Sequence, residues 1–280
     1  MRARHGVRLG RPAVVLSVAV IAASVITAGP AEARVGGAGA PSASAAPALR
    51  VNLPLGWTSG ARNHALRRGT SSYDFANWSG YVVSGDFRAV IGDWTVPTVT
   101  PTATNEYSSD WLGIDGFDNT DLIQTGTEQD SVNGQAVYYA WWEILPAAET
   151  VFTTMTVHPG DTMSAEVIGE DANPVTWEMR LTDETTGQFD YSARRYGGPH
   201  DSAEWVQEAT QVNGVISTPP QLSTSTFSQL YTYALSNQAV TAQNPELTSA
   251  DEMFLVQNGL TYYTPSAAVG GNEFTVSYTG

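Results

Sequence analysis

Hydrophobic and polar positions alternate along most of the chain from Tyr73 onward. Short runs rich in Val, Thr, Tyr and Trp are separated by turn signals roughly every 8–12 residues. The turn signals are Ser84-Gly85-Asp86, Asn133-Gly134, Pro159-Gly160-Asp161, Thr186-Gly187, Asn213-Gly214 and Asn258-Gly259. No long amphipathic segment with helical periodicity interrupts the series. This pattern predicts an all-β fold, an antiparallel sandwich or barrel.

The same alternation sorts side chains between the two faces of each predicted strand. In one strand Trp141 and Glu143 share a face. In another Glu204 and Glu208 share a face, and in a third Gln124 points away from its apolar neighbours. Three strands thus direct polar groups towards what we expect to be one aromatic-lined groove. Such a groove would bind an extended polymer, either a polypeptide or a polysaccharide.

Composition and charge narrow the function. With 42% hydrophobic and 15% charged residues the chain can bury a core, and without cysteine it has neither disulfides nor a thiolate zinc site. All 13 basic residues are arginines. Nine lie in residues 1–72 with one acidic residue, a net charge of +8, and the other four accompany 27 acidic residues, a net charge of −23. Such an acidic domain repels nucleic acids and anionic membranes, so we expect neither as a partner.

The first 33 residues have the three parts of a secretory signal peptide. Arginines precede an apolar run over residues 13–28, and small residues surround a cleavage position after Ala33. The alternative, a transmembrane anchor, needs about 20 apolar residues, and this run is shorter. We therefore expect a secreted, extracellular protein with no membrane association once the signal is removed.

Residues 34–72 are predicted to be a basic propeptide and linker in front of a domain over residues 73–280. The Gly, Ala, Ser and Pro composition of residues 35–47 cannot bury enough apolar surface to fold alone. Arg62, Arg67 and Arg68 follow, and their charge would hold this segment on the acidic domain. A disordered N-terminal arm is the alternative interpretation.

Familiar catalytic and metal-binding motifs are absent. The sequence has no Gly-x-Ser-x-Gly, no His-Glu-x-x-His and no Cys nucleophile. We expect His158 and His200 to be solvated loop residues. Residues 115–121 resemble a calcium loop only faintly, because their oxygen ligands stand in the wrong order. We predict no metal and no other cofactor, which leaves carboxylate and amide chemistry.

Five motifs resemble, in the same order, the successive motifs of the glutamic peptidases, also called eqolisins. They are Asn77-Trp78-Ser79-Gly80, Trp111-Leu112-Gly113-Ile114-Asp115-Gly116, Leu122-Ile123-Gln124-Thr125-Gly126, Ala140-Trp141-Trp142-Glu143 and Ala203-Glu204-Trp205-Val206-Gln207-Glu208. The resemblance covers essentially all of residues 73–280. It implies a β-sandwich of two antiparallel, roughly seven-stranded sheets.

The resemblance also implies roles for single residues. It places a catalytic pair at Gln124 and Glu204, and substrate-binding or positioning side chains at Trp78, Trp111, Asp115, Trp141, Glu143 and Glu208. A carboxylate at Glu204 can take a proton from an attacking water and return it to the leaving amine. The amide of Gln124 can donate to the oxyanion that forms. The implied function is that of a secreted, monomeric, acid-active endopeptidase with polypeptide substrates.

Two other functions remain open from the residues alone. Glu143 and Glu204 on one aromatic groove would also suit a glycoside hydrolase, and the groove alone would suit a carbohydrate-binding module. Of the three functions, the peptidase alone requires both Gln124 and Glu204. In each case the charge of −23 predicts a domain that is more stable in acid than at neutral pH.

Overall fold

The computed structural model describes residues 66–67, 71–170, 174–235 and 243–280. These residues belong to one folded unit, residues 51–280. The predicted signal peptide, residues 1–33, lies outside the described residues, as does nearly all of the predicted propeptide, residues 34–72. Within the described ranges, no helix has the length and apolar character needed to cross a membrane.

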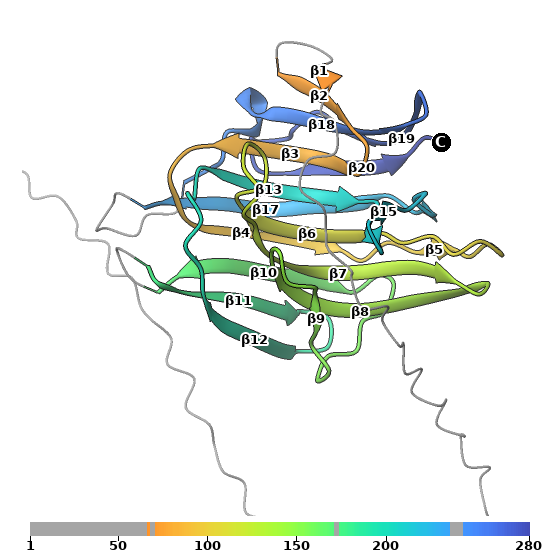
Figure 1. The fold of residues 1–280 in the computed structure, drawn as a ribbon, viewed down its shortest axis with the longest axis horizontal. Helices are drawn as coiled ribbons and strands as arrows, with labels where there is room; N and C mark the ends of the chain where they lie inside the picture. Colours follow the sequence, from red (N-terminus) through yellow and green to blue (C-terminus); the bar gives the residue numbers. More distant parts are fainter. Residues whose placement is uncertain (1–65, 68–70, 171–173, 236–242) are drawn as a thin grey trace, which may run out of the picture. The chain divides into compact units, whose positions relative to one another are not determined.

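The prediction of an all-β fold is confirmed, since strands dominate and the described helical structure is the short 3-10 element η1 (Leu247–Ser249) (Figure 1). The strands are β1 (Leu66–Arg67), β2 (Ser72–Phe75), β3 (Trp78–Ser84), β4 (Phe87–Thr95), β5 (Val99–Thr100), β6 (Ser109–Ile114), β7 (Ile123–Val132), β8 (Gln135–Ile144), β9 (Thr150–Val151), β10 (Thr162–Gly169), β11 (Thr176–Asp183), β12 (Gln188–Arg195), β13 (Ser202–Glu208), β14 (Gln211–Val212), β15 (Val215–Ile216), β16 (Gln221–Leu222), β17 (Ser225–Ala234), β18 (Asp251–Gln257), β19 (Leu260–Pro265) and β20 (Phe274–Tyr278).

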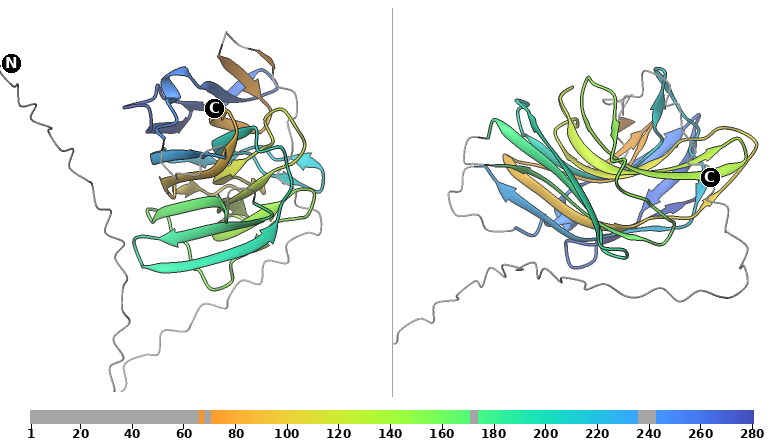
Figure 2. Two further views of the ribbon diagram at one scale, coloured as in Figure 1. Left: turned by 90° about the vertical axis from the view of Figure 1, so that its left-hand side faces the viewer. Right: turned by 90° about the horizontal axis from the view of Figure 1, so that it is seen from below.

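Hydrogen bonds join most strands into one continuous path that folds into two layers (Figure 2). One layer runs β12-β11-β10-β4-β17-β20-β19 and the other β18-β3-β13-β6-β7-β8-β9. The β18–β19 hairpin connects the layers, with a register shift between Leu255 and Val256. The two expected sheets of seven strands are thus two layers of one 16-stranded hydrogen-bonded sheet, to which β1 and β2 also belong.

The hydrophobic core fills the space between the layers and follows the alternation of the strands. On β11, Trp177, Met179 and Leu181 are buried, while the residues between them face outward. Burying an apolar side chain of this size stabilises the fold by about 1.5–3 kcal/mol. Trp205 of β13 links the layers, because its indole N–H donates to the carbonyl of Ile91 on β4 at 3.0 Å.

The two layers meet differently on the opposite side of the fold. Strands β9 and β12 end the path, so strand pairing does not join the layers at this side of the described fold. A side-chain contact is found there instead. The guanidinium of Arg194 on β12 lies 4.6 Å from the ring centroid of Trp142 on β8, a distance that favours a cation–π interaction.

Three predicted Asn-Gly turns form tight hairpins. Asn133-Gly134, Asn213-Gly214 and Asn258-Gly259 connect β7 to β8, β14 to β15 and β18 to β19. Both residues of each pair have positive φ, from 52° to 54° for Asn and from 76° to 78° for Gly. Asn and Gly tolerate this left-handed region, and the resulting turn matches the twist of the paired strands. The turn residues therefore fix the register of these hairpins.

Asp110 of β6 is a carboxyl group within the layer interface, beside the buried polar side chains of Ser225 and Gln207. It is fully buried, and its Oδ2 accepts a hydrogen bond from the Ser225 hydroxyl at 2.8 Å. Burial raises the pKa of Asp110 to about 8, although the Ser225 hydrogen bond opposes the rise. Asp110 is therefore protonated in the folded protein at acid pH.

We predict that Asp110→Asn stabilises the protein at pH 8 and changes little at pH 4. Because the folded pKa lies above the unfolded value, the fold loses stability as pH rises from about 4 towards 8. Each pKa unit corresponds to about 1.4 kcal/mol. Asparagine keeps the acceptor for Ser225 and does not ionise. Thermal melts at both pH values measure the effect.

The matched control is Asp86→Asn, which makes the same change at an exposed turn. We also expect the wild type to melt at a higher temperature at pH 4 than at pH 8. An Asp110→Asn protein with the same pH dependence of its melting temperature as the wild type would show that Asp110 does not limit stability.

Candidate active site

Four residues from adjacent strands form one row across the β18–β9 layer, which we call the central row. Strand pairing places Glu204 of β13 opposite Gly113 of β6, Gly113 opposite Gln124 of β7, and Gln124 opposite Glu143 of β8. Directly opposed residues point to the same face of a sheet. Trp205, next to Glu204, points into the core, so the central row lies on the face that is turned away from the other layer.

Gly113 leaves a gap in the middle of the central row. Strands are about 4.8 Å apart, so the backbones of Glu204 and Gln124 are separated by about 10 Å, with no side chain between them. A Cβ atom at Gly113 would lie 2.9 Å from the carbonyl oxygen of Ile123 and 3.1 Å from the Cβ of Gln124. It would also lie 3.1 Å from Cδ1 of Leu122, so only glycine fits here and Gln124 and Leu122 pack directly against the β6 backbone.

Glu204 is buried without a compensating partner. Its side chain has no exposed surface, and among the described residues neither carboxyl oxygen has a hydrogen-bond partner. Burial raises the pKa of Glu204 well above its usual value, and the charges of Asp115 and Asp201 add to the rise. The Ser202 hydroxyl opposes it. The carboxyl is therefore protonated in acid.

Gln124 is held in a defined orientation by Glu143. Its amide nitrogen donates a hydrogen bond of 2.7 Å to Oε2 of Glu143, and both side chains are buried. A carboxamide nitrogen carries two hydrogens, and this bond uses one of them. Glu143 thereby fixes which end of the amide is the nitrogen and restricts its rotation.

The three predicted tryptophans pack beside the central row. Trp111 and Trp141 flank Gly126 in the next row along the strands, and a Cβ at Gly126 would lie 2.6 Å from the Cβ of Trp111. Trp78 contacts Trp111 edge-on, with ring centroids 5.1 Å apart. All three indoles are fully buried. They form an aromatic cluster next to the central row rather than an exposed wall.

Asp115 lies at the end of β6 and organises the loop that leads into β13. Its carboxylate accepts hydrogen bonds from the Tyr196 hydroxyl (2.5 Å), the backbone N–H groups of His200 (3.0 Å) and Asp201 (2.9 Å), and the Asn119 amide (3.3 Å). Burial raises the pKa of Asp115, and these donors oppose the rise. Because the loop ends where β13 begins, Asp115 positions the strand that carries Glu204.

The structure corrects one expectation in this loop. His200 is only half solvated, since its ring stacks on Trp177 at 4.7 Å, and burial lowers its pKa. His158 is a loop residue as expected, with a side chain that is 63% exposed. The four donors occupy the carboxylate of Asp115, and no three His, Asp or Glu side chains of the described residues are arranged so that they could hold a metal ion.

Glu208 belongs to a second acidic group on the same face, which we call the carboxyl cluster. Glu208 accepts hydrogen bonds from the Asn77 amide at 3.0 Å and the Trp111 indole at 2.8 Å. Burial raises the pKa of Glu208 to about 8 and that of Asp130 to about 7. The remaining members are Glu128 and Glu149, whose pKa values burial raises well above the usual range.

Glu128, Asp130 and Glu149 were not predicted as site residues from the sequence. The signal for the first two was present, because β7 presents every second residue from Gln124 to the same face. Glu149 comes from a connection and not from a strand, and the hydrogen bond that it accepts from the Tyr139 hydroxyl at 2.8 Å carries no sequence signature.

Fold and site together define a class of protein. It consists of antiparallel β-sandwiches in which a glycine on the middle of three strands separates a buried carboxyl from a carboxamide. The sequence of residues 76–278 matches the peptidase A4 family. The chain belongs to this family, which confirms the resemblance to the glutamic peptidases.

Two fungal relatives are similar in sequence. Aspergillopepsin-2 of Aspergillus niger is 30% identical over 166 residues, which cover 50% of this chain and 58% of the relative. Scytalidopepsin B of Scytalidium lignicola is 30% identical over 115 residues, which cover 40% of this chain and 42% of the relative. The matched regions thus span about half the length of each relative.

Two solved structures share the fold. Scytalido-glutamic peptidase with a transition state analog inhibitor superposes with a TM-score of 0.63 and 22% identity. SCP-B, a member of the eqolisin family, in complex with the tripeptide Ala-Ile-His superposes with a TM-score of 0.59 and 21% identity. Each match covers 73% of this chain and 98% of the other.

We predict that Asp115→Asn destabilises the fold by roughly 1–3 kcal/mol, because the new amide N–H₂ group faces donors where the carboxylate accepted from them. Urea unfolding at pH 5 measures the loss. Asp121→Asn, an exposed change in the same loop, is the matched control and should have no effect. Equal stability of Asp115→Asn and the wild type would mean that the four hydrogen bonds do not hold this loop.

Proposed function

We propose that the protein is a secreted, acid-active glutamic endopeptidase in which Glu204 and Gln124 act on a peptide bond bound over Gly113. The observation that carries the proposal is the row itself, in which Gly113 adds no side chain between the carboxyl of Glu204 and the oriented amide of Gln124. Family membership supports peptide hydrolysis as the reaction. The proposed reaction uses neither a metal nor a nucleophilic side chain.

The reaction would begin with a water in the gap beside Glu204. The carboxylate takes a proton from this water as its oxygen attacks the scissile carbonyl carbon. The amide N–H₂ group of Gln124 donates to the carbonyl oxygen as it becomes an oxyanion. Glu204 then gives its proton to the amine nitrogen, and the C–N bond breaks. Glu143 keeps the amide oriented throughout.

The raised pKa of Glu204 changes the expected pH dependence. An ordinary Glu titrates near pH 4.3, so its base form would be abundant in moderate acid. Burial shifts this equilibrium towards the protonated form. A water that enters the gap solvates the carboxyl and lowers the pKa again, so we expect the acid limb of the activity profile to report Glu204 in the opened site.

The geometry argues against the glycoside hydrolase. Glu204 and Glu143 are three strands apart in the central row, about 14 Å between backbones. Glycosidase carboxyl groups lie about 5–9.5 Å apart, a range that two Glu side chains reach only if they lean towards each other from this backbone separation. Glu143 is also engaged by the Gln124 amide, which the glycosidase mechanism does not use.

Digestion of denatured casein at pH 3–4, with an aspartic-protease inhibitor present, tests the proposal. We expect the wild type to cleave. Gln124→Ala should lower kcat about 10²–10³-fold, as the loss of an oxyanion donor does. Glu204→Gln should lower it at least about 10²-fold, as the loss of a general base does.

Matched controls make the same chemical changes at exposed positions, Gln221→Ala and Glu170→Gln, and should keep wild-type activity. Thermal melts verify that each variant folds. Folded, processed wild type that leaves casein intact, or a folded Glu204→Gln variant with full activity, would overturn the proposal.

We further propose that the 280-residue chain is a latent precursor. The side chains of Gln124, Glu143 and Glu204 are fully buried in it, so a polypeptide substrate reaches them only after part of the chain moves away. The basic segment of residues 34–72 suits this role, because its arginines are attracted to the acidic domain only while the carboxylates remain ionised.

The purified precursor should therefore be stable at neutral pH and should lose its basic segment at pH 3–4, with cleavage near residues 68–73. Gel electrophoresis and N-terminal sequencing of the product measure this. Glu204→Gln precursor serves as the control, and it should stay intact if the protein processes itself. Wild-type precursor that remains whole and inactive in acid would contradict latency.

A further inference from the structure

The outer face of the β12–β19 layer carries two exposed aromatic rings. Phe189 and Tyr191 of β12 are 54% and 53% exposed. They are two residues apart and therefore share a face. Their rings are near parallel, with an interplanar angle of 21° and centroids 5.9 Å apart. Most large aromatic side chains of this domain, including six tryptophans, are buried. A pair of neighbouring rings that stays exposed to solvent therefore indicates a binding surface.

These rings border an open pocket of about 510 Å³. Strand pairing aligns Tyr191 with Arg180 and Glu166, and Phe189 with Thr182. The pocket lies over these two rows and reaches Ile91 of β4. Its volume falls in the range of small-molecule sites. We call the rings and the pocket together the outer-face site.

The floor of the outer-face site is polar, and its charges are already paired. Arg180 donates to Glu166 at 2.8 Å and also pairs with Glu178. Two carboxylates surround one guanidinium, so the site has no spare positive charge for an anion. The hydroxyl groups of Ser164 and Thr182 complete the polar lining. The strongly acidic domain repels polyanions as well.

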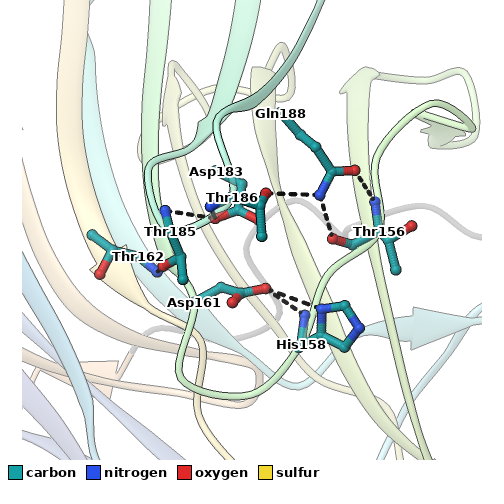
Figure 3. A network of polar contacts seen from close by, with 8 residues as sticks. All are labelled: Thr156, His158, Asp161, Thr162, Asp183, Thr185, Thr186 and Gln188. Carbon is teal, nitrogen blue, oxygen red and sulfur yellow. Dashed lines mark hydrogen bonds and ion pairs between the residues drawn. The ribbon is translucent and has the colours of Figure 1, made fainter. Parts of the chain in front are cut away.

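Hydrogen bonds hold the β11–β12 hairpin, which carries the two rings of the outer-face site, in a fixed position. Figure 3 shows the end of the β11–β12 hairpin bound to the loop before β10. Gln188, next to Phe189, accepts from the backbone N–H of Thr156 at 3.0 Å and donates to its carbonyl at 3.3 Å. Asp183 accepts from the N–H groups of Thr185 and Thr186 at 2.9 and 3.1 Å. The rings are therefore carried on a fixed hairpin, which lowers the entropic cost of binding.

We propose that the outer-face site binds a neutral polysaccharide. A pyranose ring has an apolar C–H face that packs flat on an aromatic ring, and hydroxyl groups at its edge that bind fixed donors and acceptors. Phe189 and Tyr191 supply two adjacent apolar surfaces, and the paired Arg180, Glu166 and Glu178 supply oriented polar groups. The site lies on the opposite layer from the central row, so binding is separate from the proposed peptidase activity.

Native gel electrophoresis in the presence of hydroxyethyl cellulose or laminarin tests the proposal, followed by calorimetry with cellohexaose. The full-length Glu204→Gln chain serves as the reference protein, so the result does not depend on peptidase activity. We expect retardation by at least one polymer. In this background, Phe189→Ala/Tyr191→Ala should weaken binding about tenfold or more. Leu260→Ala/Val269→Ala, which removes two other exposed side chains, should bind normally.

Three outcomes would overturn the proposal. The first is no retardation and no heat with any of these sugars. The second is retardation that the Phe189→Ala/Tyr191→Ala pair leaves unchanged, because binding would then occur elsewhere. The third is a raised KM for casein in the same pair of substitutions, made in the active chain, without sugar binding. That result would identify the outer face as a polypeptide-binding surface instead.

Discussion

This structure depends on the constraint that its buried carboxyl groups have no basic side chains to pair with. After Tyr73 the chain has four arginines for 27 acidic residues, and Arg180 is already shared by two surface carboxylates. The acids inside the fold must therefore be neutral, because an uncompensated buried charge is very costly, unless several donors bind the carboxylate as they do at Asp115. Asp110 in the core, the carboxyl cluster and Glu204 all obey this rule. Acidity thus favours the folded state, whereas the proposed chemistry requires Glu204 to ionise once water enters the site.

The sequence predicted the fold class and the facing of most site residues, because both follow from local rules. Period-two alternation and Asn-Gly turns define strands and hairpins without tertiary information. Since alternation assigns each side chain a face, Gln124, Glu143 and Glu204 could be placed on a common groove in advance. The ordered motifs then identified the family, which no single motif would have done.

Other features required the three-dimensional register. That Gly113 separates Glu204 from Gln124 depends on how three strands slide past one another, and a slip of one residue would have moved these side chains to the other face. Glu149 joins the carboxyl cluster through a connection, and His200 is stacked on Trp177 across the sequence. Contacts of this kind are set by long-range packing, so a strand pattern does not reveal them.

The two layers of the sandwich are joined by strand pairing along one side only. At the β18–β19 hairpin, backbone hydrogen bonds continue from one layer to the other. At the opposite side, where β9 and β12 end the path, the layers meet through the side chains of Arg194 and Trp142. Partial opening would disrupt the fewest backbone hydrogen bonds if it began at that edge. Amide protons of β8 and β12 would then exchange before those of β3 and β20. When the pH rises, water would enter the layer interface first at the side where β9 and β12 lie.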